Sequence, residues 1–213
     1  MRNIAFKECP IKIWPMTDWQ KLYEEKNTPW DRGAASPVLI DWLGSHRMPG
    51  AILVPGCGPG NDLLALATSG AEKVVGLDIA AGAIAIAAER TRGMDGVSLV
   101  TGDLFTLDHG SLRCRFDWVF EHTCFCAIDR SRREDYVRSV AGALRPGGHL
   151  LAVFYLEPWD QDEDQTQGPP FRSDLHELDA LFGSEFDLLY SAIPTTSFPG
   201  RAGKELIRLL RRC

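Results

Sequence analysis

The fold of this protein is decided by one glycine-rich stretch, Val54-Pro55-Gly56-Cys57-Gly58-Pro59-Gly60. An apolar run, residues 51–55, leads into the glycines, and a helix-favouring run, residues 61–68, follows them. Glycines between a strand and a helix let the backbone turn tightly and approach a ligand closely. The spacing is not the G-x-G-x-x-G pattern of dinucleotide-binding domains, so a nicotinamide oxidoreductase is a weak alternative. The stretch therefore predicts a ligand-binding turn between a buried strand and a helix.

Apolar runs suited to buried strands alternate with helix-favouring runs along the rest of the chain. The predicted strands cover residues 51–55, 73–78, 97–101, 116–120, 149–155, 186–193 and 204–210. The predicted helices cover residues 18–25, 37–43, 61–68, 80–92, 132–144 and 174–182, with Thr17 and Ser36 as caps of the first two. An acidic stretch, residues 157–167, is expected to form a loop. The alternation predicts an α/β fold with a doubly wound, mostly parallel, seven-stranded sheet.

Length and composition favour one domain that spans residues 1–213, since 213 residues with 45% hydrophobic content can bury a proper core. The formal net charge of -6 disfavours nucleic acid as a partner. No apolar run reaches the roughly 18 to 20 residues that span a bilayer, and residues 1–10 lack the apolar centre of a signal peptide. We therefore expect no membrane partner and a cytoplasmic location, and no segment indicates a protein partner.

The six cysteines are expected to be reduced, because a chain of this size folds without disulfides. Cys57, Cys114, Cys124 and Cys126 lie in or near apolar segments, where a thiol behaves as a small hydrophobic group. Cys124 and Cys126 lack the second pair of cysteines or histidines that a zinc site needs. We therefore predict no metal site.

Two acidic residues follow the second and third predicted strands. Asp78 is placed to accept hydrogen bonds from the ribose hydroxyls of a nucleoside, and Asp103 from the exocyclic amine of adenine. Taken singly, Asp78 is more often a helix cap, Asp103 a solvated loop residue and the glycines a plain turn. Because all three lie at the carboxyl ends of predicted strands, where open α/β sheets bind ligands, the joint interpretation is favoured.

The order of these motifs, with Leu144-Arg145-Pro146-Gly147-Gly148 before the fifth strand, resembles the class I S-adenosylmethionine-dependent methyltransferases over roughly residues 51 to 155. The resemblance implies a Rossmann-like methyltransferase fold with S-adenosyl-L-methionine as the cofactor. The residues implied to bind it in this core are Pro55, Gly56, Cys57, Gly58, Asp78, Ile79, Gly102, Asp103 and Leu104.

The flanking segments resemble a narrower group, the thiopurine and thiol methyltransferase family, which includes thiol, thiocyanate and halide methyltransferases. The segments that carry this resemblance are Trp19 to Tyr23, Pro29-Trp30-Asp31-Arg32-Gly33, Phe120 to Ile128, Gly168-Pro169-Pro170-Phe171, and Arg201 to Leu206. It implies an amino-terminal helical lid in residues 1–46 over a catalytic core in residues 51–213.

In such enzymes the aromatic amino-terminal segment folds over the cofactor, which implies that Trp19, Tyr23 and Trp30 lie near it. Aromatic faces attract a cation such as a sulfonium by roughly 0.5 to 2 kcal/mol. The alternative is plain packing of an amino-terminal helix. Trp30 is the stronger candidate, because it lies in a loop with Pro29 and Gly33.

Glu121, His122 and Arg201 are the candidate catalytic residues. Glu121 is expected just after the fourth strand, paired with the sulfonium or methionyl end, and His122 beside it would orient or deprotonate the acceptor. Family members tend to place tyrosine or arginine at the position of His122, so the resemblance leaves the identity of the acceptor open. Arg201 would attract an anion. Each has a structural alternative. Glu121 would be a carboxylate at a helix amino terminus, His122 a hydrogen-bonded loop histidine, and Arg201 a solvated turn residue.

The sequence thus predicts an enzyme that transfers a methyl group to a small-molecule acceptor, a small thiol or similar soft nucleophile such as a thiol, sulfide, thiocyanate, halide or thiopurine. Transfer from a sulfonium is an in-line displacement, which needs no nucleophilic residue of the protein. The alternatives are an O- or N-methyltransferase of a small natural product and a non-catalytic adenosylmethionine-binding protein.

Overall fold

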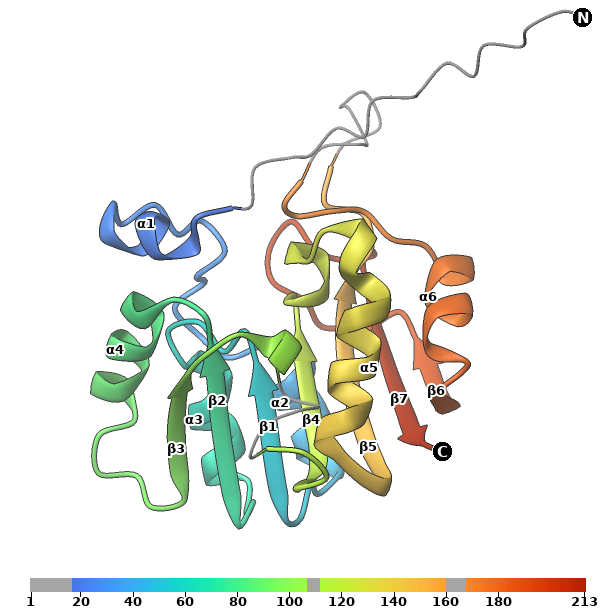
Figure 1. Ribbon diagram of the computed structural model, residues 1–213, viewed down its shortest axis with the longest axis horizontal. Coiled ribbons are helices and arrows are strands. Elements are labelled where there is room, and N and C mark those ends of the chain that lie inside the picture. Colours follow the sequence, from blue (N-terminus) through green and yellow to red (C-terminus); the bar gives the residue numbers. More distant parts are fainter. Residues whose placement is uncertain (1–16, 107–111, 160–167) are drawn as a thin grey trace, which may run out of the picture.

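The computed structural model describes residues 17–106, 112–159 and 168–213, and these residues form an α/β fold around one seven-stranded sheet (Figure 1). The strands are β1 (Ala51–Pro55), β2 (Lys73–Asp78), β3 (Val97–Thr101), β4 (Phe116–His122), β5 (Leu144–Tyr155), β6 (Phe186–Ala192) and β7 (Glu205–Arg212). Their order is β3-β2-β1-β4-β5-β7-β6. Strands β1 to β5 pair in parallel and β7 pairs antiparallel with β5 and β6, which confirms the predicted mostly parallel sheet. The strand order reverses between β1 and β4, where such sheets bind ligands.

Helices cover both faces of the sheet. They are α1 (Trp19–Glu24), α2 (Pro37–Ser45), α3 (Asn61–Thr68), α4 (Ala81–Arg90), α5 (Arg133–Ala143) and α6 (Leu175–Phe182), with short 3-10 helices at Leu104–Thr106, Phe125–Ala127 and Arg130–Arg132. In Figure 1, α5 lies in front of the sheet and α2 and α3 lie behind it. No helix of the described residues is both long and apolar enough to cross a membrane.

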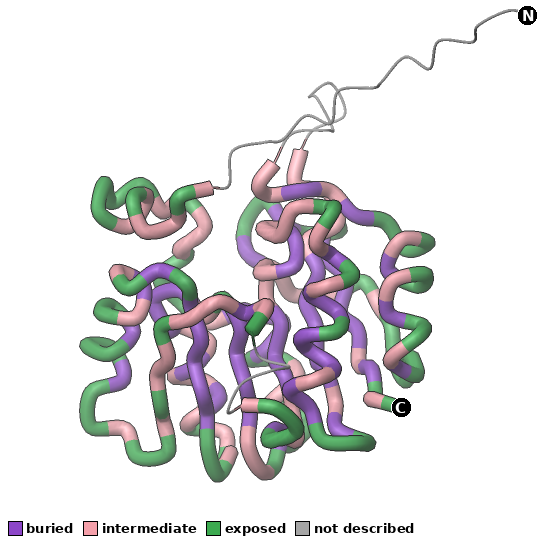
Figure 2. The backbone as a smooth tube through the Cα atoms, in the orientation of Figure 1, coloured by how far each residue is buried: buried purple, intermediate pink, exposed green. Residues whose placement is uncertain are grey.

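Two apolar clusters hold these layers together, one on each face of the sheet. The first joins alternate strand residues to α5 and α6, and it contains Val119, Tyr136 and Phe182. The second joins the other strand face to α2 and α3, and it contains Phe120 and Leu63. Figure 2 shows the result as buried residues that line the strands and the inner sides of the helices. Neighbouring residues of one strand therefore enter different clusters, as the alternation of a strand requires.

Three sequence predictions are corrected by the structure. The cap of α1 is Asp18, whose side chain accepts from the backbone N–H of Lys21, and not Thr17. Strand β4 continues past residue 120, because Glu121 and His122 still pair with residues of β5. Strand β5 begins at Leu144 rather than at residue 149, since Leu144 is buried and already pairs with β4. Of the predicted loop, residues 160–167 lie outside the described part of the chain.

Candidate functional site

The glycine-rich turn lies between β1 and α3, at the carboxyl edge of the sheet. Gly56 and Gly58 have φ values of 58° and 52°, in the left-handed region that favours glycine. A Cβ at Gly56 would lie 2.7 Å from Sγ of Cys124, so no side chain fits there. The backbone N–H of Cys57 donates to the carbonyl of Leu77 at 3.0 Å, which ties the turn to β2.

Asp78, the last residue of β2, holds the turn from the other side. One carboxylate oxygen accepts from the N–H of Gly58 and the other from the N–H of Ala80, both at 2.9 Å. Burial raises the pKa of Asp78. Each oxygen has a further lone pair for a ligand hydroxyl. Ile79 follows with an exposed side chain, so an oriented carboxylate and an apolar surface lie together.

The end of β3 lies next to Asp78 and brings the second predicted carboxylate to the same edge. The N–H of Gly102 donates to the carbonyl of Asp78 at 2.9 Å. Asp103 accepts from the N–H of Phe105 at 2.9 Å, which fixes its side chain against the turn that follows. Leu104, the next residue, is buried. The structure therefore brings together the three strand ends that the sequence predicted.

The three predicted aromatic residues form one cluster beside the glycine-rich turn. The indole N–H of Trp30 donates to the hydroxyl of Tyr23 at 3.2 Å, and the rings of Trp19 and Trp30 meet edge to face at 5.3 Å. A Cβ at Gly58 would lie 3.2 Å from the Tyr23 hydroxyl, so Tyr23 reaches the turn itself. Burial raises the pKa of Tyr23 to about 12, so it stays neutral.

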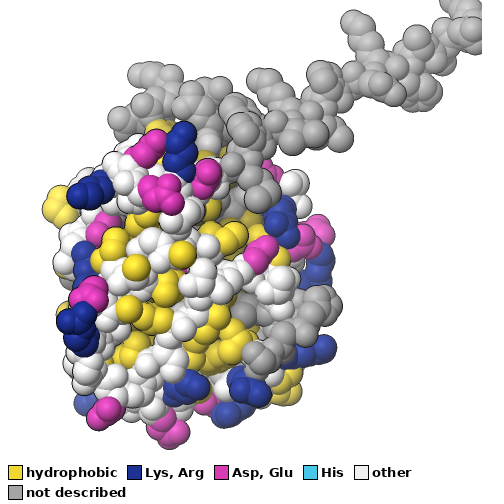
Figure 3. All heavy atoms as spheres, turned by 60° about the vertical axis from the view of Figure 1, so that its left-hand side comes forward, with side chains coloured by type: hydrophobic (Ala, Val, Ile, Leu, Met, Phe, Trp, Pro, Cys, Tyr) yellow, Lys and Arg dark blue, Asp and Glu magenta, His cyan; other side chains and the backbone are white. Residues whose placement is uncertain are grey.

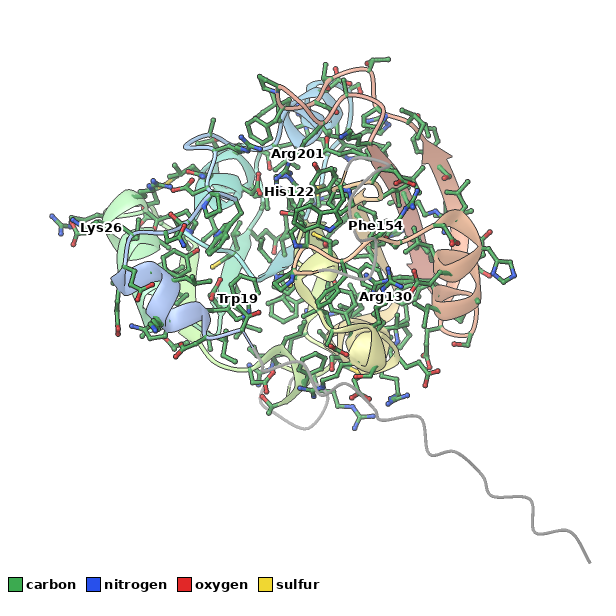
Figure 4. The ribbon with its side chains drawn as sticks, turned by 90° about the horizontal axis from the view of Figure 1, so that it is seen from above. Trp19, Lys26, His122, Arg130, Phe154 and Arg201 are labelled. Carbon is green, nitrogen blue, oxygen red and sulfur yellow. The ribbon has the colours of Figure 1, made fainter. Side chains whose placement is uncertain are left out.

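Polar contacts that the sequence did not reveal attach this amino-terminal segment to the core. The side-chain oxygen of Gln20 accepts from the N–H of Gly82 in α4 at 2.9 Å. Asp31 accepts from the side chain of Asn61 at 2.8 Å, and Arg90 donates to both side chains. Helix α1 is therefore held over the carboxyl edge near α4, as the view from above also shows (Figure 4).

Glu121 does not lie after β4 as predicted, but within it, with its side chain in the core beside α5. It is 0% exposed. Its oxygens accept from the N–H of Phe125 at 2.9 Å and from the hydroxyl of Tyr136. Burial raises its pKa to about 7. Since Phe125 begins a 3-10 helix, the alternative of a carboxylate at a helix amino terminus is the one that the structure supports.

His122 has its side chain on the opposite face of β4, near α3 and the glycine-rich turn. Its Nδ1 lies 2.8 Å from a carboxylate oxygen of Asp62, and its ring stacks on Phe198 with a centroid distance of 6.2 Å. Burial lowers its pKa, but the charge and hydrogen bond of Asp62 outweigh burial, so the pKa lies above its ordinary value. Its Nε2 is buried and has no hydrogen-bond partner.

Arg201, in the turn before β7, is 5% exposed, so the alternative of a solvated turn residue is wrong. Its guanidinium lies 4.7 Å from the ring of Tyr155 and 5.9 Å from that of Phe198. Its Nη1 donates to Glu205 at 3.3 Å, while its Nε is buried without a partner. Figure 4 shows Arg201 and His122 next to each other, in agreement with the ring of Phe198 that both contact.

Three thiols, those of Cys57, Cys124 and Cys126, lie in the glycine-rich turn and in the segment after β4, and all three are kept protonated. Burial raises the pKa of Cys57 and of Cys124, and raises that of Cys126 to about 12. A thiolate is the reactive form of cysteine, so these thiols are poor nucleophiles. Cys114, by contrast, is exposed, although it lies near an apolar segment of the sequence. Among the described residues no group of histidine, cysteine or carboxylate side chains could hold a metal ion.

Comparison with known proteins agrees with this geometry. The profile of the family described as Thiopurine S-methyltransferase matches residues 15–193. The chain belongs to this family. Thiocyanate methyltransferase 1 of Arabidopsis thaliana is 35% identical over 193 residues, which are 88% of this chain and 81% of the relative.

Solved structures share the fold. One, from work on the conversion of a disulfide bond into a thioacetal group in echinomycin biosynthesis, has a TM-score of 0.72 and 25% identity over 86% of this chain and 84% of that chain. Another, 1,6-didemethyltoxoflavin-N1-methyltransferase of Burkholderia thailandensis with S-adenosylhomocysteine, has a TM-score of 0.67 and 19% identity over 90% and 84% of the two chains. This protein is accordingly an S-adenosylmethionine-dependent S-methyltransferase of small thiol-type substrates, as predicted.

The described residues suit that cofactor. Asp78 offers lone pairs beside the exposed Ile79, and the turn leaves no room for a side chain at Gly56 and little at Gly58. When bound, S-adenosylmethionine supplies an electrophilic methyl group on a sulfonium. The protein residues need only hold the reactants and exclude water.

Proposed function

We propose that this methyltransferase acts on a small, soft nucleophile that reacts as an anion, of the thiocyanate, sulfide, thiolate or halide class. The observation that carries the proposal is the pair of buried nitrogen atoms, Nε2 of His122 and Nε of Arg201, that have no partner. A buried polar group without a partner costs about 1 to 3 kcal/mol, so a ligand that accepts from both would be favoured. Both nitrogens are donors when His122 is protonated.

The walls of the proposed acceptor site favour a small and polarisable ligand. Phe198 and Tyr155 pack against Arg201, and the ring of Phe198 also covers His122. An anion that enters such an apolar site loses its hydration, and soft anions with weakly held water lose least. The name of the Arabidopsis relative, a thiocyanate methyltransferase, supports the same class.

We assign the cofactor to the three strand ends and the aromatic cluster. Asp78 would bind the ribose hydroxyls, Asp103 the adenine amine, and Ile79 and Leu104 the faces of the base. The aromatic cluster of Trp19, Tyr23 and Trp30 would cover the turn as a lid. For Glu121 we propose support of the loop after β4 rather than contact with the cofactor, because both its oxygens bind protein groups.

We further propose that the protein works in the cytosol on free small molecules and not on nucleic acid. The face shown in Figure 3 carries apolar side chains near its middle, with basic and acidic side chains mixed around them. Such mixing does not form the continuous basic surface that binding to phosphates needs. The formal net charge of -6 supports the same conclusion.

The test is a methylation assay with purified protein, S-adenosylmethionine and one acceptor at a time. Thiocyanate, iodide, bisulfide and methanethiol would be compared with a phenol and an amine, and methylated products would be measured in the headspace or by mass spectrometry. We expect product with the sulfur nucleophiles and iodide. Product with the phenol or amine alone would instead support an O- or N-methyltransferase. Arg201→Met should raise KM for the anions by about tenfold, while Arg211→Met, an exposed arginine in β7, should not.

A further inference from the structure

Asp62 is the residue that fixes His122, although it lies sixty positions away in the sequence. It stands in the first turn of α3, directly after the glycine-rich turn. One carboxylate oxygen lies 2.8 Å from Nδ1 of His122, and the other accepts from the backbone N–H of Ser36 at 2.7 Å. Because each oxygen has its own partner, the carboxylate cannot rotate freely. The side chain of His122 is 11% exposed and that of Asp62 14%.

This contact determines what the other ring nitrogen can do. A carboxylate accepts only, so Nδ1 of His122 carries the hydrogen in both the neutral and the charged form of the ring. The single proton that the ring can gain or lose is then on Nε2. That atom is buried and has no partner, and Arg201 lies beside the ring.

The charges that face His122 come from three elements. Asp62 faces it from α3, Arg201 from the turn before β7, and Glu205 from β7 itself. Glu121, the residue before His122 on β4, has its side chain on the opposite face of the sheet. There it accepts from the hydroxyl of Tyr136 and from the N–H of Phe125. Two facing carboxylates thus exceed one guanidinium, which favours the protonated ring and agrees with the direction of its pKa.

We propose that Asp62 is a positioning residue that holds the proton-exchanging Nε2 of His122 toward the acceptor, so that one site serves both permanent anions and neutral thiols. The proposal rests on the proposed function of the site and deepens it. Asp62 itself touches neither the acceptor nor the cofactor in this scheme; it acts through His122.

The two kinds of acceptor use the same proton in opposite ways. A permanent anion such as thiocyanate accepts the Nε2–H of protonated His122, and no proton moves while the methyl group is transferred. A neutral thiol instead gives its S–H proton to Nε2 of neutral His122. The thiol sulfur then bonds to the methyl carbon as the methyl–sulfonium bond breaks, and that electron pair stays on the departing sulfur. The proton leaves His122 to solvent once the products are released.

Opposite pH profiles follow from this scheme. With thiocyanate, kcat/KM should be highest at pH values below the pKa of His122 and fall as pH rises through it. With methanethiol, kcat/KM should be low below that pKa and rise through it, because only the neutral ring can take the proton. Removing the charge of Asp62 should lower the pKa of His122 and move both profiles to lower pH together.

The experiment compares the full-length wild type with Asp62→Asn, which retains an oxygen for Ser36. The C–H resonances of the imidazole rings are titrated by NMR without cofactor, with His122→Gln to assign the signal of His122 among the five histidines. In parallel, kcat/KM is measured against pH for thiocyanate and methanethiol. We expect Asp62→Asn to lower the midpoint of His122 by about one pH unit and, above both midpoints, to lower kcat/KM for thiocyanate about tenfold. Asp41→Asn, an exposed carboxylate of α2, is the matched control and should change neither quantity.

An unchanged midpoint in Asp62→Asn, or profiles that run in the same direction for both acceptors, would overturn the inference. Should Asp62→Asn fail to fold, His122→Gln decides the question, since its amide can meet Asp62 but exchanges no proton. It should abolish the fall of the thiocyanate profile, and a fall retained at the same pH would refute the scheme. Absence of product from every acceptor in the wild type would defeat the proposed function instead, while the NMR titration would still test the pairing of Asp62 with His122.

Discussion

Replacement of Glu121 by Gln should make the protein more stable at neutral and alkaline pH. Burial raises the pKa of Glu121 from 4.5 to about 7. Between these pH values the folded protein holds a proton that the unfolded chain has released, so its free energy of unfolding falls as pH rises and levels off above pH 7. At about 1.4 kcal/mol per pH unit, this loss amounts to about 3 to 4 kcal/mol. Glutamine resembles the protonated acid in shape and does not titrate, so the variant lacks this loss.

The assay is urea unfolding of wild type and Glu121→Gln at pH 5, 6, 7 and 8, followed by tryptophan fluorescence. We expect similar stability at pH 5 and an advantage of the variant that grows toward pH 8. A difference that stays constant with pH would refute the reasoning about burial. The affinity for S-adenosylmethionine, measured by calorimetry, should change less than about twofold. A tenfold loss of affinity with an intact fold would restore the contact with the cofactor that the sequence predicted.

Other substitutions test the rest of the site and its support. Asp78→Ala should weaken cofactor binding in calorimetry by about 1.5 to 3 kcal/mol, the range for hydrogen bonds to a charged group, and unchanged affinity would remove Asp78 from the site. Gly56→Ala should abolish cofactor binding, because its Cβ would meet Cys124. Adding Cys124→Ala to this variant should restore only the part of the binding that the clash removes. Arg133→Met should lower the free energy of unfolding by about 3 kcal/mol, because it removes a buried cation that donates to three partners. A loss of stability under about 1 kcal/mol would contradict this. His122→Phe should change the preferred acceptor in product assays with cofactor affinity retained, and loss of that affinity would contradict its placement.

The sheet and the residues that meet at its carboxyl edge could be predicted from sequence because they follow from local patterns. Short apolar runs with β-branched residues mark the parallel strands, and the residue after each run lies at the carboxyl edge whatever the rest of the chain does. Gly56, Asp78 and Asp103 were found in this way. The end of β4 was predicted wrongly, since Glu121 is a poor strand residue by composition and is accommodated through its bonds to Tyr136 and Phe125.

The residues that contact His122 in the proposed acceptor site could not be predicted from the sequence. Asp62 follows a glycine-rich turn, where a carboxylate is usual simply because it stabilises a helix amino terminus. Nothing local to Asp62 indicates that its side chain meets His122, and nothing local to Phe198 indicates that it covers the same ring. Such contacts join three separate elements of the fold, so only the tertiary structure reveals them.

The contrast between Glu121 and His122 shows why adjacent residues of one motif have different roles. They are neighbours on β4, and the alternation of a strand sends their side chains to opposite faces of the sheet. Glu121 enters the apolar layer beside α5, where its charge is costly and both its oxygens are bound. His122 enters the layer beside α3, where Asp62 supports its charge and leaves Nε2 available. A shift of β4 by one residue would exchange these environments, so the pairing of β4 with β5 sets which of the two residues faces the proposed acceptor site.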